Sequence, residues 1–130
     1  MAVIFDMDGV IADTQRIHSG IESEMLAELG LHISPEEITR RFSGRSLRDQ
    51  YEELFREAGR PNPYRPEFSD RKADLFMARH EQFVGIEGTI ARIEWLHGRT
   101  PLAVASASRP PVVDLEFEMD CCRVTRETVI

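Results

Sequence analysis

The chain has 130 residues, of which 42% are hydrophobic and 30% are charged, and its net charge is −7. This length suits one ordinary domain, or a small domain with an insertion, and the composition excludes a disordered chain. The acidic balance argues against nucleic acid and anionic membrane surfaces as partners. No apolar stretch approaches the ~20 residues that span a bilayer, and no secretory signal is recognised. The only cysteines, Cys121 and Cys122, are adjacent and predict no disulfide framework, so we expect a cytoplasmic protein.

A short apolar run at residues 2–5 predicts a buried β-strand, and Asp6, Asp8 and Gly9 follow it. The carboxyl end of such a strand lies at the edge of an open α/β sheet, where ligands usually bind. One carboxylate there can attack, the other can move a proton, and both can help to hold a cation. The pattern therefore favours Mg²⁺-dependent phosphoryl transfer through a covalent aspartyl-phosphate. A simple turn is the alternative reading, because Asp and Gly are common turn residues.

Beyond this motif the apolar spacing becomes helical. Apolar residues recur every four positions over residues 17–29, and Gly30 is a typical C-terminal stop. A short helix is expected over residues 35–42, where Ser34 caps the start and Glu37 completes a capping box.

Three more helices are expected at about residues 47–58, 67–83 and 89–97, and we expect Trp95 in the last of them to be a core residue. A second apolar run at residues 102–105 predicts another buried strand. Two short strands thus flank a mostly helical stretch, and each strand runs into a polar loop. Both loops are expected to face the same crevice.

Three segments and one histidine carry a resemblance to a known family. They are residues 3–14 (VIFDMDGVIADT), His18, residues 42–46 (FSGRS) and residues 102–108 (LAVASAS). With them the sequence closely resembles the haloacid dehalogenase superfamily, in the branch that contains β-phosphoglucomutase and small sugar-phosphate phosphatases. The resemblance covers about residues 2–110. It implies a Rossmann-like α/β core of parallel strands, formed by residues 1–13 and 81–130, with a helical cap domain inserted at residues 14–80.

The resemblance also implies roles for residues in the core. Asp6 would be the nucleophile and Asp8 the general acid and base, and the Asp6 carboxylate and Asp8 carbonyl would bind Mg²⁺. That cation cancels the repulsion between carboxylate and phosphate. Gly9 would give the sharp turn that leaves N–H groups near phosphate oxygens. The Ser106 hydroxyl and the Ala107 N–H would hold the transferring phosphoryl oxygens, although an ordinary loop serine is the alternative for Ser106.

In the cap, the resemblance implies substrate contacts for His18 and Arg45, and Lys72 resembles a cap lysine of the mutases. The alternatives are a surface or half-buried helix histidine, a solvated loop arginine and a plain charged helix face. Asp13 and Thr14 are expected to cap the first cap helix.

The family pattern also needs a lysine that balances the phosphoryl charge and an acidic pair that completes the Mg²⁺ shell. No lysine follows Arg109, and the acidic residues at 114–120 form no strand-end pair. We therefore expect a truncated chain with impaired activity. We also expect either that the chain depends on a partner piece or that the cap folds better than the core. Resemblance is expected to end near Pro110. A one-base shift across residues 115–120 permits the sequence WSLKWT, which looks like the family's next helix, so a frameshift is one explanation and deliberate shortening is the other.

Three functions stay open from the sequence. The first is an Mg²⁺-dependent phosphomonoester hydrolase that acts on a small phosphorylated metabolite, a sugar phosphate above all. The second is β-phosphoglucomutase, in which the aspartyl-phosphate returns its phosphoryl group to sugar. His18 and Lys72 favour the mutase, whereas the turn at residues 42–46 favours a phosphatase. The third is an inactive fragment or binding module.

Overall fold

The computed structural model describes residues 2–106 and 108 of the chain. These residues divide into two compact units. The strand unit comprises residues 2–15, 79–106 and 108, and the helical unit comprises residues 16–78. Predictions that concern Ala107, the two cysteines and the segment at residues 115–120 lie outside the described residues.

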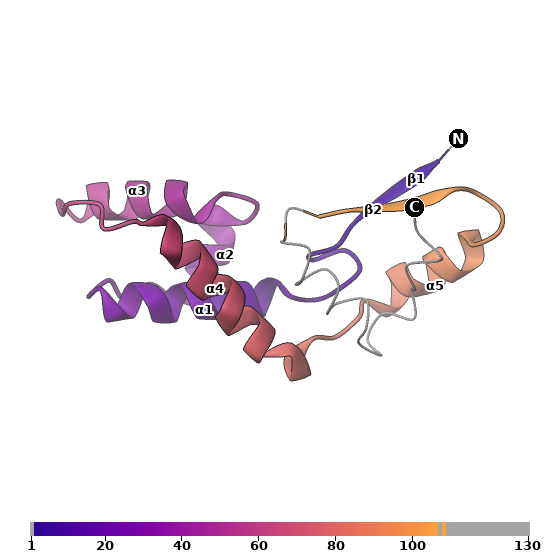
Figure 1. Ribbon diagram of the computed structural model, residues 1–130, viewed down its shortest axis with the longest axis horizontal. Coiled ribbons are helices and arrows are strands. Elements are labelled where there is room, and N and C mark those ends of the chain that lie inside the picture. The colour runs from indigo at the N-terminus through magenta and orange to yellow at the C-terminus, as the bar shows by residue number, and fades with distance from the viewer. Residues whose placement is uncertain (1, 107, 109–130) are drawn as a thin grey trace. The chain divides into compact units, whose positions relative to one another are not determined.

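The strand unit contains two parallel strands and one α-helix (Figure 1). Strand β1 (Val3–Asp6) pairs with β2 (Leu102–Ala105), and helix α5 (Glu87–Leu96) precedes β2. In the pairing register Asp6 lies opposite Ala105. Parallel strands need a crossover connection, and α5 lies on it. The predicted α/β class with parallel strands is confirmed.

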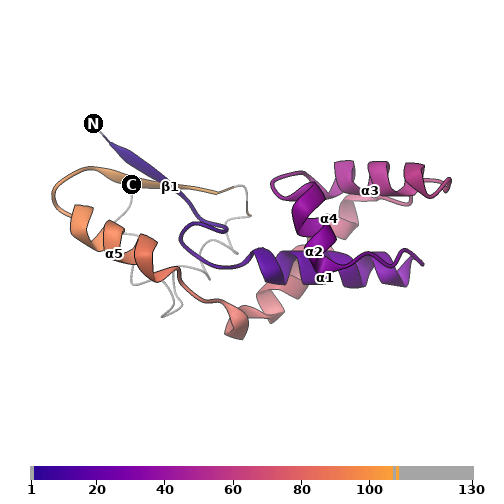
Figure 2. The ribbon, with the colours of Figure 1, turned by 180° about the vertical axis from the view of Figure 1, so that it is seen from behind.

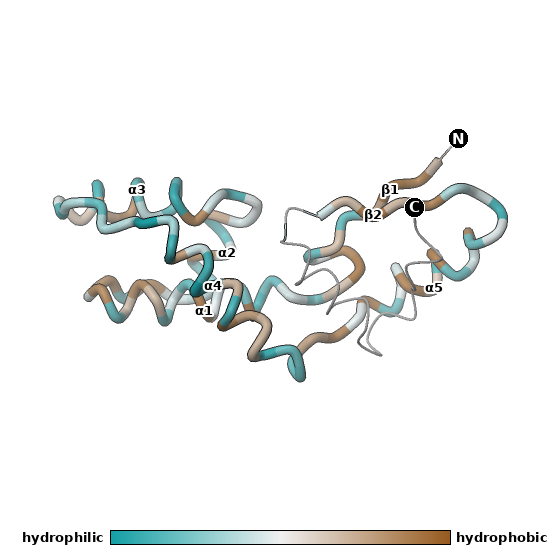
Figure 3. Tube along the Cα trace, viewed as in Figure 1, coloured by the Kyte–Doolittle hydropathy of each residue, from teal (hydrophilic) through white to brown (hydrophobic). Residues whose placement is uncertain are grey.

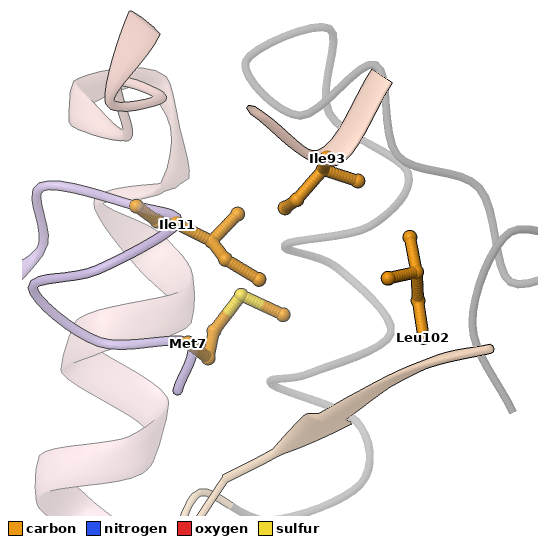
Figure 4. Packing of buried hydrophobic residues seen from close by; sticks show 5 residues of the cluster. Met7, Ile11, Ile93 and Leu102 are labelled. Carbon is orange, nitrogen blue, oxygen red and sulfur yellow. The ribbon is translucent and has the colours of Figure 1, made fainter. Parts of the chain in front are cut away.

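The core of this unit combines the loop after β1 with α5 and β2. Its buried members are Met7, Ile11, Ala12, Ile93 and Leu102. Figure 4 shows the labelled members pointing toward one another from three different segments. The Met7 carbonyl accepts the N–H groups of Ile11 and Ala12 at 3.0 and 3.1 Å, which folds the loop back onto the core. The loop that contains Asp8 is therefore anchored by apolar packing on both sides.

The expectation that β1 is a buried strand is wrong for one of its faces. Val3 and Phe5 pack against the core cluster, whereas Ile4 is 69% exposed. Successive side chains of a strand point to opposite faces of the sheet, so a single covering layer buries only every second residue. Figure 3 shows that β1 is nevertheless hydrophobic along most of its length.

The expectation that Trp95 is a core residue is also wrong, because its side chain is 53% exposed. Ile93, two positions earlier on α5, is buried. Two residues of a helix turn through about 200°, so these side chains take opposite faces. The guanidinium groups of Arg92 and Arg99 lie 5.7 and 4.8 Å from the Trp95 ring. Cation–π contact thus replaces core packing for this indole.

The helical unit contains α2 (Pro35–Phe42), α3 (Leu47–Glu57), α4 (Pro66–Ala78) and nearly all of α1 (Gln15–Glu28), as Figures 1 and 2 show. Gly30 follows α1 with a φ of +78°, in the left-handed region that suits a helix stop. In the described part of the chain, no helix is long and apolar enough to cross a membrane.

Two local predictions need correction. The Ser34 hydroxyl accepts the Glu37 N–H at 3.2 Å, as a cap should, but the Glu37 carboxylate pairs with Arg41 at 3.4 Å instead of completing a capping box. Helix α4 ends at Ala78 rather than near residue 83. A 3₁₀ turn at His80–Gln82 follows it, which is a common way for a helical segment to tighten near its end.

Candidate active site

Asp6 is the last residue of β1, and its side chain is exposed. One carboxylate oxygen, Oδ1, accepts the N–H of Met7 at 2.8 Å. Because Asp6 lies opposite Ala105 in the parallel pair, it stands beside the start of the loop that carries Ser106. The two strand ends therefore bring their polar loops to one edge of the sheet, as the sequence predicts.

Asp8 is half-buried, and hydroxyl groups hold both of its carboxylate oxygens. Thr14 donates to Oδ1 at 2.6 Å, and Ser108 donates to Oδ2 at 3.0 Å. One donor on each oxygen holds this carboxyl group in a defined orientation. Thr14 is fully buried, which keeps its hydroxyl in place.

Ser106 directly follows β2, and its Oγ accepts the N–H of Ser108 at 3.0 Å. Ser108 therefore contacts both Ser106 and Asp8. Ser106 and Asp8 were both predicted as site residues. The structure joins them through Ser108, to which the sequence assigned no role. Ala107, between the two serines, lies outside the described residues.

Gly9 adopts a φ of +76°, which explains why glycine follows Asp8. Its own N–H donates to the Ala12 carbonyl at 2.8 Å. Gly9 thus contributes to the site through the shape of its turn, since its amide proton is already used within the loop.

The donors predicted for a metal are the Asp6 carboxylate and the Asp8 backbone carbonyl. Both are hard oxygen donors of the kind that Mg²⁺ prefers, and this ion commonly takes one or two carboxylates and keeps several waters. In residues 2–106 and 108, no three His, Cys, Asp or Glu side chains gather as a metal-binding group. The donor set is thus compatible with Mg²⁺ and would supply part of its coordination shell.

His18 and Lys72 belong to the helical unit, where they lie on facing helices α1 and α4. The His18 ring is half-buried and stacks on Phe76 with 4.1 Å between ring centroids and 3° between planes. One turn along each helix, the Lys72 ammonium pairs with the buried Glu22 carboxylate. The two predicted residues therefore share one helix pair.

Arg45 also lies in the helical unit, in the turn between α2 and α3. Its guanidinium donates to Glu53 at 2.7 Å and sits 5.2 Å from the Phe42 ring centroid. Hydrogen bonds from Arg45 and Arg41 lower the pKa of the Glu53 carboxyl. The exposed arginine predicted to reach a substrate is thus anchored within its own unit.

Thr14, Ser108 and Glu22 make contacts with predicted site residues that the sequence did not reveal. Thr14 was expected only as a helix cap, and Ser108 and Glu22 had no assigned role. The sequence offered only weak signals for two of them: Ser108 lies two positions after Ser106, and Glu22 lies one helical turn after His18. Neither signal identifies a partner, because the partners lie far away in sequence.

Residues 3–120 match the family described as haloacid dehalogenase-like hydrolase. That match covers most of the chain, which therefore belongs to the haloacid dehalogenase-like hydrolase family. The match also continues beyond residue 110, where the resemblance was expected to end. No curated protein matches the chain.

Solved structures show the same fold. A haloacid dehalogenase-like protein of unknown function from Agrobacterium tumefaciens is 28% identical, with a TM-score of 0.71 over 89% of this chain and 51% of its own. A family hydrolase from Deinococcus radiodurans, solved with bound phosphate and sodium, is 29% identical, with a TM-score of 0.64 and coverages of 89% and 50%. A mutant of CbbY from Rhodobacter sphaeroides, in complex with xylulose-(1,5)bisphosphate, is 21% identical, with a TM-score of 0.68 and coverages of 88% and 54%. The chain thus spans about half the length of these relatives.

Proposed function

We propose that this chain carries the nucleophile and the acid–base group of an Mg²⁺-dependent phosphomonoester hydrolase. The main support is the placement of two carboxylates at one end of the sheet. Asp6 ends β1 opposite the start of the serine loop after β2, and hydroxyl groups hold both oxygens of Asp8. A positioned carboxylate can serve as acid and then as base in successive steps.

In the proposed reaction, the Asp6 carboxylate attacks the phosphorus atom while the bond from phosphorus to the ester oxygen breaks. Asp8 gives its proton to the departing alkoxide, which leaves as an alcohol. The phosphoryl group stays on Asp6 as an aspartyl-phosphate. Asp8 then takes a proton from a water that attacks the same phosphorus. The bond from phosphorus to the Asp6 oxygen breaks, which releases inorganic phosphate and restores the Asp6 carboxylate. Mg²⁺, which the Asp6 carboxylate and Asp8 carbonyl would hold, supplies charge neutralisation for this chemistry.

The proposed substrate is a small phosphorylated metabolite, most simply a sugar phosphate, in the cytoplasm. Two relatives support this class, since one was solved with phosphate and another with a sugar bisphosphate. The Ser106 hydroxyl and the Ala107 N–H would receive the phosphoryl oxygens, with Gly9 shaping the turn beside them. His18 and Arg45 would meet the rest of the substrate.

A phosphomutase such as β-phosphoglucomutase is the second candidate. The observation in its favour is that His18 and Lys72 lie on the same pair of helices, where Glu22 and Phe76 hold them. In that reaction the aspartyl-phosphate returns its phosphoryl group to the sugar rather than to water.

The test incubates the purified chain with Mg²⁺ and a panel of sugar phosphates and measures phosphate release. Asp6→Asn removes the nucleophile, so release should fall on the order of 10³-fold or more. Asp13→Asn is the matched control, because this exposed carboxylate lies in the same loop outside the proposed site.

Each outcome of this assay separates the candidates. Isomerisation of β-glucose 1-phosphate without release would favour the mutase. No turnover by a chain with a folded circular-dichroism spectrum would show that this chain by itself is neither enzyme, and would favour the inactive fragment or binding module. Equal activity of the Asp6→Asn variant and the parent would contradict the nucleophile assignment.

A further inference from the structure

We propose that Ser108 is a positioning residue of the active site, which orients the Asp8 carboxylate and the Ser106 hydroxyl together. This inference rests on the proposed function of Asp8 as acid and base. Ser108 is separated from Asp8 by 100 positions in sequence, yet it contacts the carboxylate directly.

The first half of the argument concerns Asp8. A carboxylate held by one donor can still rotate about its last bond, whereas donors on both oxygens fix its plane. Thr14 supplies the donor from the loop after β1, and Ser108 supplies the donor from the loop after β2. Ser108 therefore ties the acid–base group to the second strand end. Proton transfer depends steeply on such orientation.

The second half concerns Ser106. A serine hydroxyl has one proton to donate and two lone pairs that accept. The Ser108 N–H occupies one lone pair of the Ser106 Oγ at 3.0 Å, so the hydroxyl proton of Ser106 must point away from that amide. This arrangement leaves the proton for another acceptor, and a phosphoryl oxygen is the acceptor that the proposed function provides.

Ser108→Ala tests the contact with Asp8 selectively, because it removes the hydroxyl and keeps the N–H. The measurement is kcat/KM for two substrates, a sugar phosphate and p-nitrophenyl phosphate. A sugar alkoxide needs a proton to leave, whereas p-nitrophenolate leaves without one. We expect the ratio of kcat/KM for the sugar phosphate over p-nitrophenyl phosphate to fall about 10-fold, a fraction of the whole contribution of general acid catalysis.

Two further variants make the result specific. Ser108→Thr keeps a hydroxyl at the same position and should restore the ratio. Ser106→Ala removes a proposed phosphate contact that both substrates share, so it should lower both values of kcat/KM and leave their ratio unchanged. Equal losses for both substrates in Ser108→Ala, or a folded Ser108→Thr variant that restores nothing, would overturn the proposal.

A stability measurement separates failure of this inference from failure of the proposed function. Ser108→Ala should lower the midpoint of urea unfolding in the parent chain and leave it unchanged in an Asp8→Ala background, because the partner is already gone. If no substrate is turned over by any variant, the proposed function fails while this cycle still tests the contact. Equal midpoint shifts in both backgrounds would show that Ser108 does not hold Asp8.

Discussion

The helical unit buries its large apolar side chains, whereas the strand unit leaves several of its own in solvent. Within the described residues, the exposed large hydrophobic side chains are Ile4, Val10, Val84 and Trp95, and all four belong to the strand unit. A helix satisfies its backbone hydrogen bonds internally, so four helices can enclose a core by themselves. Among the residues that the structure describes, the two-stranded sheet has two open edges, and helix α5 covers one of its faces.

Charged groups sharpen the same contrast. In the helical unit Arg41 contacts three glutamates, Glu37, Glu53 and Glu57, and these hydrogen bonds raise the pKa of its guanidinium. In the strand unit, polar contacts instead join the Asp8 carboxylate to Thr14 and to the loop after β2. The charged groups of one unit thus pair with one another, whereas the hydroxyl groups of the other gather around one carboxylate near the strand ends.

The largest expected effect comes from comparing two isoleucines of the strand unit. Ile93 is 1% exposed, so Ile93→Ala should cost about 2–5 kcal/mol in the free energy of unfolding. Ile4→Ala removes the same atoms from an exposed site and should change that energy by no more than about 0.5 kcal/mol. Urea unfolding with residue-resolved amide exchange measures both. A large loss in Ile4→Ala would mean that the outer face of β1 is covered in solution, and the contrast between the units would then disappear.

An intermediate effect is expected at the ion pair between Glu22 and Lys72. Glu22→Gln leaves the Lys72 ammonium without its partner carboxylate in a mostly buried place, which should cost about 1–3 kcal/mol. Glu52→Gln on the exposed side of α3 is the matched control and should stay within about 0.5 kcal/mol. Thermal unfolding measures both variants, and a loss recovered in Glu22→Gln with Lys72→Met would confirm that the cost lies in the stranded ammonium.

The smallest expected effect is at Tyr51. Burial, with a further contribution from Glu22, raises the pKa of the Tyr51 phenol from 10.0 to about 12. The folded state therefore holds this proton more tightly than the unfolded state. The resulting stability is fully present below pH 10 and is lost as the pH rises through about 12.

Tyr51→Phe should remove that part of the pH dependence. Within the described residues the Tyr51 hydroxyl has no hydrogen-bond partner, so the variant should be neutral or more stable by about 1 kcal/mol at pH 7. The control is Tyr64→Phe, because the Tyr64 hydroxyl lies 3.0 Å from Ser69 Oγ and its loss should cost about 1 kcal/mol. Thermal unfolding from pH 7 to pH 12 measures both variants, and a destabilised Tyr51→Phe would show that the hydroxyl has a partner.

Local patterns were enough to predict most elements. Ser34 and Gly30 mark the start and stop of two helices because capping acts within a few residues of chain. The apolar spacing located the five α-helices of the described residues, with boundaries displaced where turns tighten, as after Ala78. Both strands were predicted from their apolar runs, whereas their parallel arrangement was implied by the family resemblance. The pair Asp6 and Asp8 was recognised because a strand followed by closely spaced carboxylates is itself a local signal.

Burial and long-range partners were decided by the tertiary structure. Ile4 and Trp95 have the composition of core residues, yet their exposure depends on which layer lies above them, and no local pattern records that layer. The contact from Ser108 to Asp8 joins the ends of two strands whose register only the folded sheet defines. The sequence by itself determined the elements and the carboxylate pair, because those follow from neighbouring residues. The tertiary structure alone determined which hydroxyls hold the Asp8 carboxylate, because hydrogen-bond partners are set by distance in space.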